Sequence, residues 1–250
     1  AYWQRTWLTN ELVERELHYW QSRLKDIPVV HSLPLDTPRP NQQTYDGQSY
    51  FSDIQTGLYG EIKQLCRKHD VTLFMLLQTC YSVLLSYYSK TDDIVIGTPI
   101  SGRVHKDIEP LIGFFVNTLV MRTQTSDITS VSSLLANAKQ NTLDAYSHQH
   151  IPFDMLVDKL NPTRSASYNP IFQLWFVLQN YNKNEYALPD LTLKPISMGS
   201  NTSLFELALD ITELQSSLSL NWTFNSNLFV ISSIEKMADG KYDYEKLTLY

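Results

Sequence analysis

The six histidines are the first candidates for chemistry, because imidazole exchanges protons near neutral pH. No two of them are adjacent, and His148-Gln149-His150 is their only close pair. A zinc site needs three or four ligands, and no cysteine or carboxylate cluster accompanies this pair. We therefore favour a polar helix end or turn over metal binding for this segment. The histidines are His18, His31, His69, His105, His148 and His150.

Other common catalytic patterns are missing from the sequence. It contains no Gly-x-Ser-x-Gly nucleophile turn and no phosphate-binding loop of the Gly-x-x-x-x-Gly-Lys-Ser/Thr type. A total of 8 glycines in 250 residues further disfavours a glycine-rich cradle for phosphate.

Arg103 ends the run Gly97-Thr98-Pro99-Ile100-Ser101-Gly102-Arg103, which follows a short β-branched segment. A glycine-bounded loop after a strand can hold a charged group at a cleft. The same run is also typical of a tight turn whose arginine is paired within the fold. The sequence leaves both interpretations open.

Two further runs place polar side chains beside apolar strands. Asn117 and Thr118 end Ile112-Gly113-Phe114-Phe115-Val116-Asn117-Thr118, and burial without hydrogen bonds would be costly for them. We favour backbone partners for both over partners in a channel. In Tyr168-Asn169-Pro170-Ile171-Phe172-Gln173, Asn169 and its proline indicate a turn, and Gln173 brings an amide into the next strand.

Hydrophobic spacing predicts the elements that position these side chains. Helices are expected at 10–24, 57–69, 72–88 and 130–146, in a short stretch after Pro152, and from 228 to 237. Strands are expected at 94–97, 116–122, 171–178, 205–211 and 217–224, the last two as a hairpin. Residues 33–43 are proline-punctuated and should be extended. The order predicts one α/β lobe, a mixed β-sheet covered by helices.

Composition narrows the function classes. With 43% hydrophobic residues the chain can bury a core, and 20 basic against 26 acidic residues disfavour a nucleic-acid partner. Cys66 and Cys80 are interpreted as reduced core residues, which favours a cytoplasmic location. No membrane-spanning stretch or signal peptide is apparent, and the start without methionine suggests a fragment.

Three motifs in order resemble those of nonribosomal peptide synthetase condensation domains. The first is the run from Ile112 to Thr118 with Arg122 four residues on. The second is His148-Gln149-His150-Ile151-Pro152-Phe153-Asp154, with His150 where the family has aspartate. The third is 164–173, where Ser165 replaces an acidic residue and Tyr168 an arginine. Residues 1–5 resemble the tail of the motif that closes the family's N-terminal lobe, and residues 19–20 and 33–40 resemble its bridging segment.

The resemblance implies a chloramphenicol-acetyltransferase-like fold of two lobes around a tunnel, of which this chain is the C-terminal lobe. Residues 1–48 would form a bridging helix and extended segment, 49–238 the α/β lobe and 239–250 an atypical tail. Residues of the tunnel or its motifs would be Arg103, Asn117, Thr118, Arg122, His148, Gln149, Asn169 and Gln173. The catalytic motif, His-His-x-x-x-Asp-Gly, does not occur in this sequence and is expected in the preceding lobe.

The family joins an acyl or peptidyl thioester to the amine of an aminoacyl thioester. The implied partners are the N-terminal condensation lobe, donor and acceptor peptidyl carrier proteins and an adjacent adenylation domain. No cofactor or metal is expected on the lobe itself, since phosphopantetheine is carried by the carrier domains. This lobe alone is predicted to be inactive. The alternatives are an epimerization domain of the same fold and a non-catalytic lobe that holds carrier proteins.

Overall fold

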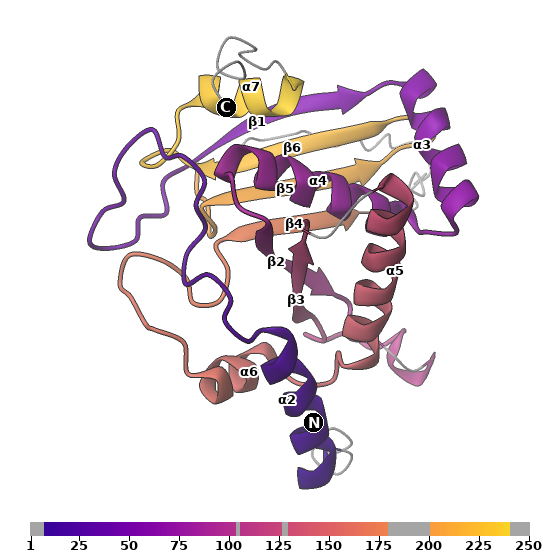
Figure 1. Cartoon of the computed structure of the whole chain (residues 1–250), viewed down its shortest axis with the longest axis vertical. Helices are drawn as coiled ribbons and strands as arrows, with labels where there is room; N and C mark the ends of the chain where they lie inside the picture. Colours follow the sequence, from indigo (N-terminus) through magenta and orange to yellow (C-terminus); the bar gives the residue numbers. More distant parts are fainter. Residues whose placement is uncertain (1–7, 104–105, 127–129, 180–200, 241–250) are drawn as a thin grey trace, which may run out of the picture.

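The computed structural model describes residues 8–103, 106–126, 130–179 and 201–240, and their centre is a six-stranded mixed sheet (Figure 1). The strand order across the sheet is β1-β6-β5-β4-β2-β3. The strands are β1 (Gly47–Ile54), β2 (Asp93–Ile100), β3 (Asn117–Gln124), β4 (Leu174–Gln179), β5 (Leu207–Glu213) and β6 (Leu218–Asn225). This architecture confirms the expected α/β lobe.

Antiparallel pairs make up both ends of the sheet. β2 pairs with β3 at one end, and β1 pairs with β6 and β6 with β5 at the other. β4 joins the two ends through parallel pairing with β2 and β5. Parallel neighbours need crossover connections, which accounts for the long stretches of chain around β4.

The helices are α2 (Asn10–Arg23), α3 (Thr56–His69), α4 (Leu73–Ser89), α5 (Val131–Ser147), α6 (Phe153–Leu160) and α7 (Ile231–Asp239). Side-chain oxygens of Thr9, Thr72 and Ser130 cap the N-termini of α2, α4 and α5. Such caps satisfy amides that have no partner inside the helix. The apolar character of α4 on nearly all sides fits its central position over the sheet.

The main core lies between one face of the sheet and four helices. α3, α4, α5 and α7 contribute buried residues that include Cys66, Leu76, Leu135 and Ile234. On β5 and β6 the residues that face this core are Leu207, Leu209, Ile211, Leu218, Leu220, Trp222 and Phe224. Since side chains alternate along a strand, the residues between them lie on the opposite face.

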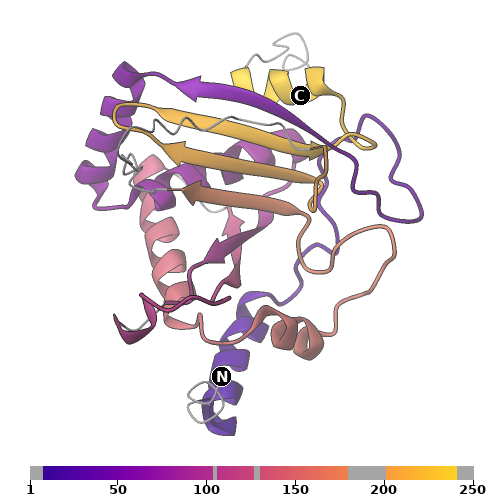
Figure 2. The ribbon, with the colours of Figure 1, turned by 180° about the vertical axis from the view of Figure 1, so that it is seen from behind.

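A second, smaller core lies at the β2–β3 end, on the opposite side of the sheet. There α2 and α6 pack against Val95 and Val120, with Leu17, Trp20 and Leu156 among the buried residues. In contrast, no described helix crosses the second face of β1, β6 and β5, as the reverse view shows (Figure 2). The described helices therefore cover both sides of the sheet only at one end.

The structure differs from the sequence-based expectations in four local features. β2 does not stop at Gly97 but continues to Ile100, and β4 begins at Leu174 rather than Ile171. β1, which begins at Gly47, was not predicted. Cys66 is buried as expected, whereas Cys80 is exposed. The tail at 241–250 lies outside the described residues.

None of the described helices is both long and apolar enough to cross a bilayer. α3 and α4 meet that criterion only as a pair, which is bent by 105°.

Gly97 should be essential to the packing of the second core. A Cβ atom at this position would lie 2.1 Å from the buried ring of Phe172. We predict that Gly97→Ala lowers the free energy of unfolding by about 1–3 kcal/mol because the ring must move. The matched control is Gly60→Ala in α3, where nothing lies within 4 Å. Gly60→Ala should raise the free energy of unfolding, measured with urea, by about 0.5–1 kcal/mol. Equal changes in the free energy of unfolding for the two variants would contradict the packing argument.

Candidate functional site

The face of β1, β6, β5 and β4 that no described helix crosses, called the uncovered face below, carries mostly polar side chains. Its twelve positions are Ser49, Phe51 and Asp53 of β1, Ser219, Asn221 and Thr223 of β6, Ala208, Asp210 and Thr212 of β5, and Trp175, Val177 and Gln179 of β4. Of these, Ala208 is buried and Trp175 packs partly against the second core. Ser49 and Thr223 are joined across two strands by their hydroxyls, 3.5 Å apart. Burial raises the pKa of Asp210 above its ordinary value. These twelve residues include two aspartates and no basic residue.

Glu206, immediately before β5, is a buried carboxylate that collects three hydrogen bonds. Arg39 donates from Nε to Oε1 at 3.0 Å and from Nη2 to Oε2 at 2.8 Å, and His31 Nε2 lies 2.8 Å from Oε2. Burial alone would raise the pKa of Glu206, but the hydrogen bonds from His31 and Arg39 lower it below its ordinary value. The site thus fastens the extended segment that contains both residues to the sheet.

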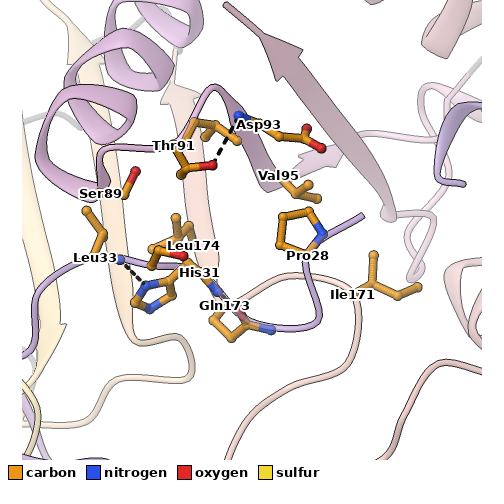
Figure 3. Close-up of a pocket in the computed structure, with 12 residues that line it drawn as sticks. Pro28, His31, Leu33, Ser89, Thr91, Asp93, Val95, Ile171, Gln173 and Leu174 are labelled. Atoms are coloured by element: carbon orange, nitrogen blue, oxygen red, sulfur yellow. Dashed lines mark hydrogen bonds between the residues drawn. The ribbon is translucent and has the colours of Figure 1, made fainter. Parts of the chain in front are cut away.

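The His31 ring also contacts its own segment. Its Nδ1 accepts a hydrogen bond from the Leu33 amide at 3.1 Å, so in the neutral ring Nε2 carries the proton and donates to Glu206. The backbone amide of His31 donates to Gln173 Oε1 at 3.0 Å. His31, Leu33 and Gln173 border a cavity of about 20 Å³, which has room for roughly one water molecule (Figure 3).

Gln173 connects three parts of the chain. Besides accepting from His31, its Nε2 donates to the carbonyls of Asn169 at 2.7 Å and Val29 at 3.4 Å. Asn169 in turn donates to the carbonyl of Leu204 at 3.0 Å. The turn expected at Asn169 therefore holds the segments that precede β4 and β5.

Arg122 on β3 fastens α2 to the sheet. Its guanidinium forms a bidentate pair with Asp93 of β2, at 2.8 and 2.6 Å, and donates to the carbonyls of Arg23 and Lys25 at 3.0 and 2.8 Å. Arg23 returns a hydrogen bond to the Arg122 carbonyl at 2.7 Å. All of these partners lie within the lobe.

Asn117, at the start of β3, holds the connection between α5 and α6. It donates to the carbonyls of Gln149 at 2.9 Å and Ile151 at 2.7 Å, and it accepts from the amide of Phe153 at 3.1 Å. Gln149 donates to the carbonyl of Tyr146 at 2.7 Å. The backbone alternative for Asn117 is thus the arrangement observed. Thr118 follows at a half-buried position opposite Pro99.

His148 is enclosed by α2. Its ring stacks on Tyr19 with centroids 4.0 Å apart, and its carbonyl accepts from Trp20 Nε1 at 2.9 Å. Its Nδ1 lies 3.4 Å from Oε1 of the buried Glu16. Burial lowers the pKa of nearby His150. Within the described ranges, no three metal-ligating side chains are placed to hold an ion.

Arg103 lies on the loop that precedes β3. Its Nη1 donates to the carbonyls of Ile108 and Glu109, and its guanidinium lies over the Phe115 ring, 4.4 Å from the centroid. This arrangement supports the loop from 106 to 116. Leu111, Ile112, Phe114 and Val116 extend from that loop into solvent, and Ile112 and Phe114 are almost fully exposed.

The motif residues therefore lie in separate places and connect segments of the lobe, rather than meeting at one reaction centre. Sequence reasoning missed the Glu206 site. Arg39 and His31 stand 167 and 175 residues from their partner, and no local pattern links positions so far apart. Along β6, and in part of β5, apolar residues alternate with polar ones in the sequence, and this pattern could have indicated a sheet with one polar face.

A comparison with family models decides the identity. The model described as "Condensation domain" matches residues 1–241. The chain belongs to the condensation-domain family. It is 37% identical over 237 residues to gramicidin S synthase 2 of Brevibacillus brevis and 36% identical over 236 residues to malpinin synthetase of Mortierella alpina. Each match covers 94% of the chain but only 5% and 3%, respectively, of those proteins.

Solved structures agree in fold. A four-domain nonribosomal peptide synthetase matches with a TM-score of 0.84 and 26% identity, over 92% of this chain and 19% of that one. The X-domain from teicoplanin biosynthesis gives 0.85 at 20% identity, over 95% of this chain and 56% of that one. An epimerization domain of tyrocidine synthetase gives 0.72 at 16%, again over 56% of its length. This condensation-domain chain thus corresponds to about half of the single-domain structures.

We predict that Glu206→Gln costs about 3–5 kcal/mol at pH 7, since it removes the charge opposite buried Arg39. The lowered pKa of Glu206 means that its contribution is present above the ordinary value of 4.5 and is lost as pH falls through the native-state value. Urea unfolding should therefore show the gap between wild type and variant shrinking towards pH 3. Glu213→Gln, at a more exposed pair with Lys63, should cost under about 1 kcal/mol.

Arg122→Lys should loosen α2, because lysine cannot form the bidentate pair and reach both carbonyls. We expect a loss of about 1–3 kcal/mol and faster amide exchange in α2 by hydrogen–deuterium exchange mass spectrometry. Arg164→Lys, at an exposed pair with Asp158, is the control and should change neither quantity. Unchanged exchange in α2 with Arg122→Lys would contradict the assigned role.

Proposed function

We propose that this chain is the C-terminal lobe of a condensation domain in a nonribosomal peptide synthetase, and that it forms amide bonds only together with the preceding lobe. The observation that carries the proposal is the sheet face left uncovered by the described helices, in a chain matching about half of single-domain relatives. A polar sheet face of this size is suited to line a tunnel between two lobes.

In this proposal the reaction joins two carrier-bound substrates. The carbonyl of a donor acyl or peptidyl thioester is attacked by the amine of an acceptor aminoacyl thioester, with both substrates on phosphopantetheine arms. The catalytic histidine motif comes from the preceding lobe, since this sequence contains no His-His pair. The present lobe supplies one tunnel wall, with carrier and adenylation domains as its neighbours. Its division at residues 48 and 239 is part of the same proposal.

The loop at 106–116 supports contact with a second lobe. Ile112 and Phe114 have exposed fractions of 105% and 91%, which is costly for apolar side chains in water. Arg103 holds this loop by hydrogen bonds and by its contact with Phe115. A supported loop that presents apolar residues is suited to dock against a matching surface.

The test is reconstitution from separately expressed halves. The purified chain should give no amide product with loaded donor and acceptor carrier domains, and adding the preceding half should restore product in single-turnover assays read by mass spectrometry. Product from the chain alone would contradict the proposal. No product from the reassembled halves or from the intact synthetase would favour the non-catalytic alternative.

The double variant Ile112→Asp/Phe114→Asp should weaken association of the two halves at least about tenfold in analytical ultracentrifugation. Leu58→Asp/Tyr87→Asp is the matched control, because these apolar residues are also exposed but lie on α3 and α4. Equal association by both double variants and the wild type would show that the loop is not the contact.

A further inference from the structure

Asp210 and Asn221 form a pair of hydrogen-bond acceptors at the centre of the uncovered face. They lie directly opposite each other on the antiparallel strands β5 and β6. Side chains at such positions have Cβ atoms roughly 4.5–5.5 Å apart, so both can contact one ligand atom. Phe51 and Val177 flank the pair on the neighbouring strands.

Both acceptors lack a donor in the part of the chain that the structure describes. There Asn221 Oδ1 is buried without a hydrogen-bond partner. Among these described residues the Asp210 carboxyl also accepts no hydrogen bond. Burial alone raises the pKa of Asp210, so no positive charge among the described residues offsets the burial of its carboxylate. A buried acceptor without a donor is unfavourable, and a carboxylate without a counter-charge even more so.

The charges around Asp210 and Asn221 indicate the charge of the ligand group that could satisfy both acceptors. The twelve residues that define the uncovered face include Asp53 as the other charged residue and no lysine, arginine or histidine. A cation therefore meets no repulsion from them and compensates Asp210, whereas an anion would be repelled. A primary ammonium group offers three donors on one small atom, which suits two acceptors side by side.

Asn221 Oδ1 can reach such a ligand without a change of backbone. The terminal torsion of asparagine is broad, so Oδ1 can turn towards a ligand that contacts Asp210. Oδ1, which is buried without a hydrogen-bond partner, then accepts a hydrogen bond from the ligand.

We propose that Asp210 and Asn221 bind a primary ammonium group of a carrier-bound substrate. This inference rests on the proposed function, because the substrate is taken to enter between the two lobes. Two groups share this chemistry: the α-ammonium of an aminoacyl thioester and the side-chain ammonium of a basic residue in the substrate.

The experiment uses the intact synthetase and three stable pantetheine amides. The first carries glycine, with an α-ammonium; the second carries N-acetylglycine, with none; the third carries Nα-acetyl-lysine, with a side-chain ammonium only. Dissociation constants are measured by isothermal titration calorimetry for the wild type, Asp210→Asn and Asn221→Leu. Asp53→Asn is the matched control, an aspartate on the same face but on the outer strand β1.

We expect at least one ammonium probe to bind about tenfold tighter than the N-acetylglycine probe, and the tighter one identifies the source. Asp210→Asn should bring the three constants within about twofold, and Asp53→Asn should leave the preference intact. Asn221→Leu should reduce the preference several-fold while raising the midpoint of thermal unfolding, because it removes an unsatisfied acceptor. A purely structural role for Asn221 would not lower the preference.

Three outcomes would overturn the inference. The first is equal affinity for all probes, or no binding of any, in a synthetase that still makes its peptide. The second is a preference for ammonium that survives Asp210→Asn. The third is a loss of association between separately expressed halves with Asp210→Asn, which would assign the carboxylate to a basic residue of the preceding half. Failure of the proposed function would show separately, as amide product from the isolated chain or as no product from the intact synthetase.

Discussion

Burial of the sheet from one side is the constraint on which the rest of this lobe depends. Four helices cover one face with a continuous apolar core, while a second, smaller core covers the opposite face only around β2 and β3 in the described residues. An antiparallel arrangement of β1, β6 and β5 tolerates a polar second face, because such strands need burial on one side only. Within the described residues, the lobe thus folds around its main core and presents a polar wall on the second face of these strands.

Buried polar contacts then hold the N-terminal segments against this frame. Glu206 binds the extended segment through His31 and Arg39, and Arg122 binds α2 through Asp93 and two backbone carbonyls. Apolar packing would leave these extended residues free to slide, whereas directed hydrogen bonds to a charged group fix their position. Since both segments precede the sheet in the chain, their position sets how anything upstream approaches the polar wall.

Much of the fold was predictable from local patterns, and the failures have physical causes. Helical spacing found most of the helices because they have a distinct apolar face. α4 was recognised as a long segment that is apolar on nearly all sides, with Thr72 as its cap. β1 was missed because an edge strand with one uncovered face has few apolar residues, and Gly97 looked like a strand end because its close contact with Phe172 is tertiary. The motif residues were found by resemblance, but the partners of Glu206 depend on contacts between distant segments.

Hydroxyl-radical footprinting of side chains, with and without the preceding half, tests most directly that this chain is one half of an enclosure. The account predicts that Phe51 on the uncovered face and Phe114 on the 106–116 loop lose reactivity when the halves combine. Tyr87 lies on the outer surface of α4, and the exposed fraction of its side chain is similar to that of Phe51. It should react equally in both samples. Unchanged reactivity of Phe51 and Phe114 in a sample shown to contain both halves in one complex would contradict the account.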